Sequence, residues 1–371
     1  MSEAYNSTYF VTGGGTGGHI YPAMAVADAL SEDGARICYV GNRRNMEYKL
    51  ALKKGYKFLH VGVSGMPRGL NIKFFWWGVR LFKSILYSIR YIKKYKPSAV
   101  FATGGYVSAP MIFACIITKT PYMMHDCDAM PGLVTRKLSK RAKYVSLAFE
   151  KAKRYIPNKN IIVTGNPIRP EFKTLDKNTA REQLSLKNKL TLTIMGGSQG
   201  ARSINRAAVD VIKEFTQNYG MQVIFQTGRK NYEEVLENLR LIYPAWEQEG
   251  NILLRPYFDD MISVLKATDI VVSRAGSLSL SEICASGCAA ILVPYPYAAA
   301  NHQRINAKNM LENGACVYIE DKDFEPNKLR TVLLEMINNQ TKINYLKQNA
   351  LYLARYDATE NIKKCIQSIN K

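Results

Sequence analysis

The chain has 371 residues, 47% of them hydrophobic, which suffices for two α/β domains and excludes a disordered protein. Of its net charge of +21, residues 1–165 carry +17, from 25 Lys and Arg against 8 Asp and Glu. This asymmetry predicts an anionic partner for the N-terminal half, either nucleic acid or anionic lipid. The seven scattered cysteines are typical of a reduced cytosolic protein, and neither a signal peptide nor a bilayer-spanning run is expected.

The first predicted strand, residues 9–11, enters a glycine-rich loop, residues 12–19, that continues into an Ala-rich helix. Five of the eight loop residues are glycine, and His19 closes the loop. Glycines let a ligand approach the backbone closely, and the free N–H groups at a helix start bind anions. The loop therefore predicts a phosphate or diphosphate site.

The same loop also satisfies the dinucleotide pattern G-x-G-x-x-G through Gly13, Gly15 and Gly18. That pattern requires an acidic residue about 20 residues further on, to bind a ribose. The second predicted strand, residues 37–40, ends in Gly-Asn-Arg-Arg and offers no acid. NAD is therefore disfavoured, and an NADP-binding oxidoreductase remains an alternative from another class.

Residues 71–96 predict an amphipathic helix. We expect one apolar stripe of it to face the core, formed by Phe75, Phe82, Ile85, Ile89 and Ile92. Further apolar side chains lie beside cationic ones, which is typical of a helix on an anionic membrane surface. The expected membrane contacts are Phe74, Trp76, Trp77, Arg80 and Lys83. A buried helix with a solvated flank is the alternative, and nucleic acid is disfavoured because no recognised module accompanies the charge.

The second half of the chain repeats the order of the first. A strand at residues 190–195, a glycine turn at 196–202 and a helix at 205–215 match the opening, and residues 269–280 match residues 99–110. Alternating strands and helices indicate parallel sheets, so we expect two similar doubly wound domains with ligands in the cleft between them. The expected division is a first, membrane-associating domain, 1–165, a second domain, 166–345, and a C-terminal helix, 346–371, that packs back toward the first; the family resemblance given below implies that the first domain binds an acceptor and the second a donor.

Six short motifs in order resemble those of the bacterial peptidoglycan N-acetylglucosaminyltransferases, members of glycosyltransferase family 28, over essentially the whole chain. They lie at residues 14–22, 104–108, 165–169, 196–201, 274–282 and 294–303. The resemblance implies the GT-B fold, UDP-GlcNAc as donor, inversion at the sugar C1, and conversion of lipid I to lipid II at the C4 hydroxyl of the muramyl sugar. It also implies no cofactor or essential metal, no nucleic acid, a peripheral site on the cytoplasmic face of the inner membrane, and cell-wall synthesis or division proteins as candidate partners.

The resemblance carries over residue by residue. Arg169 and Ser198 would reach the donor diphosphate, Glu282 the ribose, Phe258 the uracil and Gln303 the GlcNAc hydroxyls. The remaining donor contacts would be Thr16, Gly17, Gly18, Asp128, Ser277, Leu278 and Ser279. The acceptor diphosphate would contact Gly14, Gly15 and Tyr106.

One motif departs from the family. The usual His-Glu-Gln-Asn is His125-Asp126-Cys127-Asp128 here, so Asp128 puts a charge where an amide would contact the sugar. The change also creates Asp-x-Asp, the metal motif of the other large glycosyltransferase fold, which we interpret as coincidence.

The reaction needs a general base for the acceptor hydroxyl, and His19 is the first candidate and Asp126 the second. Alternatively, His19 only hydrogen-bonds a phosphate. A glycosyltransferase acting on diacylglycerol and a non-enzymatic membrane subunit remain as further alternatives.

Overall fold

The computed structural model describes residues 7–67, 69, 71–197 and 199–369, which form two compact units. Unit 1 comprises residues up to Ile168 together with Asp357 onward, and unit 2 comprises Arg169–Tyr356. The second unit thus ends at Tyr356, not at residue 345, because α15 (Gln340–Leu353) packs against α12 (Ser277–Ser286) and β12 (Ala289–Leu292). The returning segment is α16 (Ala358–Ser368), which packs against α1 (Gly17–Glu32) of unit 1.

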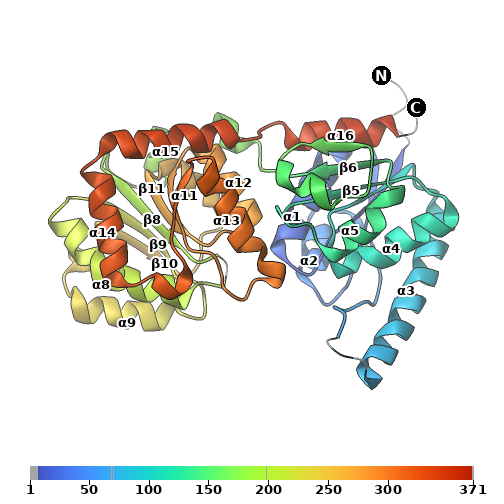
Figure 1. The fold of residues 1–371 in the computed structure, drawn as a ribbon, viewed down its shortest axis with the longest axis horizontal. Coiled ribbons are helices and arrows are strands. Elements are labelled where there is room, and N and C mark those ends of the chain that lie inside the picture. The colour runs from blue at the N-terminus through green and yellow to red at the C-terminus, as the bar shows by residue number, and fades with distance from the viewer. Residues whose placement is uncertain (1–6, 68, 70, 198, 370–371) are drawn as a thin grey trace. The chain divides into compact units, whose positions relative to one another are not determined.

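Unit 1 is built on a seven-stranded parallel sheet of order β3-β2-β1-β4-β5-β6-β7. Figure 1 shows β5 and β6 of this sheet, with α16 beside them. Its strands are β1 (Thr8–Thr12), β2 (Arg36–Gly41), β3 (Lys57–His60), β4 (Ala99–Ala102), β5 (Tyr122–Asp126), β6 (Tyr144–Leu147) and β7 (Ile161–Val163). Its other helices are α2 (Met46–Lys53), α3 (Ile72–Tyr95), α4 (Gly105–Thr118) and α5 (Leu133–Leu138).

Both faces of this sheet are buried, as a parallel sheet requires. In β1, Phe10 packs into a cluster with Met111 and Ile112 of α4, whereas its neighbour Val11 packs on the opposite face with Ile20 of α1 and Ile362 of α16. Alternate strand residues therefore serve two cores, and α16 completes one of them.

Unit 2 has a six-stranded parallel sheet of order β10-β9-β8-β11-β12-β13, the same winding as the first six strands of unit 1. The predicted duplication of two doubly wound domains is confirmed. The strands are β8 (Thr191–Met195), β9 (Gln222–Gln226), β10 (Ile252–Arg255), β11 (Ile270–Ser273), β12 and β13 (Cys316–Tyr318). The helices, besides α12 and α15, are α6 (Glu171–Thr174), α7 (Lys177–Gln183), α8 (Arg202–Gln217), α9 (Tyr232–Ile242), α10 (Trp246–Glu249), α11 (Met261–Ala267), α13 (His302–Glu312) and α14 (Pro326–Ile337).

Helix α3 packs as predicted only toward its C-terminal end. Of the expected stripe, Ile92 is buried and Ile89 packs against the core, whereas Phe75 and Phe82 are each 61% exposed. Ser84 and Ser88 are buried as well, and their small side chains allow the close approach of α3 to α4. Within the described part of the chain, no helix is long and apolar enough to cross a membrane.

Candidate active site

The glycine-rich loop of unit 1 forms the turn between β1 and α1. Gly15 has a φ of +89°, and a Cβ there would lie 3.0 Å from the Tyr106 ring, so a side chain would be strained and crowded. Gly17 and Gly18 are the first residues of α1, where a helix offers unpaired N–H donors and a positive dipole end. The loop and Tyr106 thus come together in an arrangement that suits an anion.

His19 lies in the first turn of α1 and is half-buried. Its Nδ1 is 2.8 Å from the Thr103 carbonyl oxygen. A carbonyl can only accept, so Nδ1 donates this hydrogen bond and Nε2 carries the lone pair. No partner of Nε2 is found among the described residues, which leaves it available to accept a proton.

Two glycines make room for the His19 ring. Gly104 and Gly105, at the start of α4, have φ values of +85° and +73°. A Cβ at Gly105 would lie 2.7 Å from the Gly14 carbonyl oxygen and 3.1 Å from the His19 ring. Gly104 and Gly105 therefore allow the His19 ring and the glycine-rich loop to pack closely against the start of α4.

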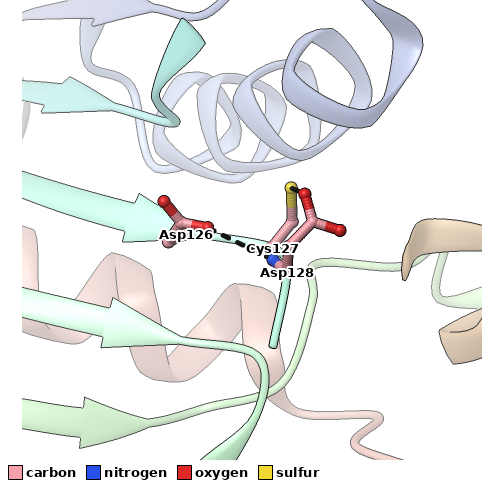
Figure 2. Close-up of side chains that lie close together, drawn as sticks. All are labelled: Asp126, Cys127 and Asp128. Atoms are coloured by element: carbon pink, nitrogen blue, oxygen red, sulfur yellow. Dashed lines mark hydrogen bonds between the residues drawn. The ribbon is translucent and has the colours of Figure 1, made fainter. Parts of the chain in front are cut away.

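Asp126, the second candidate base, ends β5 and is 1% exposed. Its two carboxylate oxygens accept backbone N–H bonds from Asp128, at 3.2 Å, and Gly132, at 3.0 Å. Figure 2 shows one of its oxygens bonded to the Asp128 N–H. Burial, followed by the charge of Asp128, raises the pKa of Asp126 to about 7. Both oxygens of Asp126 thus hold the loop that follows β5, and the geometry favours His19 as the base.

Asp126, Cys127 and Asp128 each offer one atom to a cluster in which the atoms lie within 4.8 Å of one another. The set suits a divalent cation poorly. Burial and the two neighbouring carboxylates hold the pKa of the Cys127 thiol well above its usual range, and the Asp126 oxygens already accept N–H bonds.

His125 is fully buried on the same strand and links the loop to the end of unit 1. Its Nε2 donates to Asn166 Oδ1 at 3.1 Å, and its Nδ1 accepts from the Ser146 hydroxyl at 2.8 Å. The Asn166 amide donates in turn to the Cys127 carbonyl oxygen. Burial lowers the pKa of His125 to about 4, so this side chain is a neutral structural link.

Glu47 is a residue that the sequence analysis missed. It is 0% exposed on α2, and its Oε1 accepts from the Asn42 N–H and the Asn45 amide. A Cβ at Gly14 would lie 2.6 Å from that oxygen, so Glu47 supports the glycine loop from beneath. Among the described residues its Oε2 has no hydrogen-bond partner. The available signal was its position as the last acid before an acid-free stretch that ends at Asp126.

In unit 2 the expected donor contacts gather at the carboxyl ends of the strands. Ser277, Leu278 and Ser279 form the first turn of α12, and Glu282 follows one turn later on the same helix. Arg169 Nη2 lies 3.3 Å from Glu282 Oε1. Burial raises the pKa of Glu282, and the Arg169 charge opposes that shift.

Gln303, at the start of α13, ties two strand ends together. Its Oε1 accepts the N–H groups of Ala275, at 3.2 Å, and Tyr295, at 3.0 Å, which leaves the amide nitrogen to face a ligand. The Phe258 N–H donates to Gln226 Oε1 at 2.9 Å, so in this structure that group is already paired. Ser198 lies outside the described residues.

Comparison with known proteins identifies the family of this chain. The family model of the glycosyltransferase family 28 N-terminal domain matches residues 9–147, and that of the C-terminal domain matches residues 191–366. The chain therefore belongs to glycosyltransferase family 28, enzymes of the GT-B fold. It is 40% identical over 366 residues, 97% of this chain and 98% of the relative, to the UDP-N-acetylglucosamine–N-acetylmuramyl-(pentapeptide) pyrophosphoryl-undecaprenol N-acetylglucosamine transferase of Desulforamulus reducens.

Solved structures extend the comparison. The crystal structure of MurG from Acinetobacter baumannii is 25% identical, covers 98% of this chain and 99% of that chain, and has a TM-score of 0.78. The UDP-GlcNAc 2-epimerase of Neisseria meningitidis, bound to UDP-GlcNAc, has a TM-score of 0.66 at 12% identity, over 98% of this chain and 100% of that chain. The second likeness shows the fold alone, because one fold carries different activities.

Proposed function

We propose that this chain transfers N-acetylglucosamine from UDP-GlcNAc to the C4 hydroxyl of the muramyl sugar of lipid I, giving lipid II with inversion at C1. The observation that carries this function is the 40% identity, over 97% of the chain, to a transferase named for that reaction. The family membership excludes the oxidoreductase alternative, since the glycine loop then serves a sugar-nucleotide enzyme.

The chain's own residues divide the work between the units. In unit 2, Glu282 binds the ribose, Arg169 and the start of α12 hold the diphosphate, Gln303 contacts the GlcNAc hydroxyls, and Phe258 contacts the uracil through its backbone. In unit 1, Gly14, Gly15 and Tyr106 hold the acceptor diphosphate. The N-termini of α1 and α12 supply the positive ends that stabilise phosphate charge, so UDP leaves without a proton or a metal ion.

His19 Nε2 takes the proton of the acceptor hydroxyl as that oxygen attacks C1 of the donor sugar. Support comes from its tautomer, which the Nδ1 bond to Thr103 fixes, and from its place beside the glycine loop.

Unit 1 docks on the anionic inner surface of the cytoplasmic membrane through α3. All buried residues of this helix lie from Ser84 onward, and in Figure 1 its N-terminal half extends away from α4. That half carries Trp76, 55% exposed, and Phe75, together with a shallow apolar groove of about 760 Å³ around Gly78. Lys73, Arg80 and Lys83 lie on the same half and are exposed.

The deciding experiment follows labelled GlcNAc from UDP-GlcNAc onto a lipid I analogue and, in parallel, onto diacylglycerol. We expect a disaccharide product with the first acceptor alone. Transfer to diacylglycerol in its place would establish the glycolipid alternative, and transfer to neither would refute a transferase acting on either acceptor.

A further inference from the structure

The loop that follows β5 brings the charged side chain of Asp128 near His19. The Cys127 sulfur lies 3.9 Å from His19 Nδ1 and 3.9 Å from Asp128 Oδ2. Figure 2 shows the Cys127 and Asp128 side chains extending together on one side of the strand end, while Asp126 points elsewhere. The Cys127 sulfur thus lies beside both groups, which places the Asp128 carboxylate in the neighbourhood of His19 Nδ1.

Among the titratable groups around His19, Asp128 is the one whose charge acts on its pKa. His125 is buried and neutral, with a pKa lowered to about 4, and the Cys127 thiol stays protonated. Asp126 has a pKa raised to about 7 and directs its oxygens to its own loop. Burial lowers the pKa of His19, and the charge of Asp128 is the largest opposing influence.

We propose that Asp128 is a positioning residue that raises the proton affinity of His19 during glycosyl transfer. The inference rests on the proposed function. As the acceptor oxygen forms its bond to C1, its O–H proton moves to His19 Nε2, and the C1–O bond to the diphosphate breaks with its electron pair leaving on UDP. The ring becomes a cation at that moment, and the Asp128 carboxylate stabilises it.

Asp128→Asn removes the charge of this side chain and keeps its size. The fold is expected to tolerate that substitution.

The first test measures kcat and KM against pH for the wild type and Asp128→Asn. We expect the acidic limb of kcat to move down by about one pH unit and its plateau to fall about 3- to 10-fold, because the base is weaker. The KM for UDP-GlcNAc should change less than about twofold. The matched control is Glu32→Gln, which removes an exposed carboxylate at the far end of α1, about 20 Å away at the helical rise.

A higher KM with an unmoved limb would overturn the inference, because Asp128 would then be a sugar contact. A loss of about 10² to 10⁴ in kcat, with His19→Gln nearly active, would overturn it as well and make Asp128 the base itself.

The second test titrates the four histidine rings by NMR in the whole protein without substrates, with His19 assigned through His19→Gln. The His19 pKa should fall by about one unit in Asp128→Asn and stay in place in Glu32→Gln. An unshifted His19 pKa refutes the inference whatever the activity. If the wild type transfers no GlcNAc, the proposed function fails, while the NMR result still decides whether Asp128 acts on His19.

Discussion

Asp126 couples the stability of unit 1 to pH through a single buried carboxyl. Its folded pKa of about 7 lies above the ordinary value of about 3.9. Between those values the folded state keeps a proton that the unfolded state has lost, so stability falls as pH rises, by at most about 1.4 kcal/mol per pH unit. Asp126→Asn cannot ionise and should lose this dependence.

The measurement is the melting temperature of the wild type and Asp126→Asn at several values between pH 5 and 7.5. We expect the melting temperature of the variant to rise relative to that of the wild type as pH increases, whatever the absolute stability of the variant. Parallel curves, like those expected for exposed Glu32→Gln, would show that Asp126 is ionised in the folded state throughout.

Glu282 tests the assignment of the donor to unit 2. Charge-assisted hydrogen bonds contribute roughly 1.5–3 kcal/mol each, so Glu282→Ala should raise the KM for UDP-GlcNAc about 10- to 100-fold. Substrate-dependence kinetics at fixed acceptor concentration measure this. Exposed Glu237→Ala is the control. An unchanged KM in Glu282→Ala would show that this carboxylate does not bind the ribose.

Chelation tests the acidic pair in the loop after β5. With helix N-termini holding the diphosphate, EDTA should leave the rate of GlcNAc transfer within about twofold of the untreated enzyme. Complete loss that a divalent ion restores would mean that Asp126 and Asp128 bind a metal after all.

At the scale of elements, α3 is a helix of 24 residues, about 36 Å long, whose fully buried residues all lie in its second half. Because the N-terminal half of α3 has no fully buried residue, the effect of a charge reversal on vesicle binding should depend on its position along the helix. Lys73→Glu/Lys83→Glu should abolish most binding to anionic vesicles at low salt, and Lys93→Glu/Lys94→Glu at the packed end should affect it far less.

Trp76→Ser/Trp77→Ser should reduce the binding that remains at high salt, because salt does not screen apolar insertion. Leu241→Ser, which removes a more exposed apolar side chain of unit 2, is the control in a vesicle sedimentation assay. An equal loss of vesicle binding from the two charge-reversed lysine pairs would mean that the whole helix lies flat on the membrane surface.

The same helix shows where reading the sequence succeeds and where it stops. Periodicity located α3 and its apolar stripe, but it could not tell that the stripe packs at Ile89 and Ile92 and is exposed at Phe75 and Phe82, since that depends on how far α3 lies against α4. The glycine loops and the two parallel sheets were predictable because βα turns and helix starts have local signatures. The support from Glu47 and the His125–Asn166 link were not, because both depend on residues that only the folded sheet brings together.

At the scale of the whole molecule, α16 completes unit 1 from the far end of the chain. Ile362 and Ile366 are 0% exposed in the core that contains Val11 and Ile20, and Lys363 pairs with Asp33 at 3.0 Å. Truncating a buried Ile to Ala costs about 2–5 kcal/mol. Ile362→Ala/Ile366→Ala should therefore destabilise unit 1 selectively.

Hydrogen exchange measures this directly. Amides of α1 and β1 should exchange faster in the double variant, and those of β8 and β9 should keep their wild-type rates. Exposed Lys364→Ala is the control, and uniform acceleration across both units would show that they unfold together.

The return of α16 also sets an order of events on the ribosome. Chains are made from the N-terminus, and domains generally fold as they emerge. Unit 1 is synthesised first, yet the helix that closes its α1 face emerges only after all of residues 169–356. A nascent or prematurely terminated chain therefore displays an unfinished apolar face on its first unit, so completed synthesis is a condition for a fully folded unit 1.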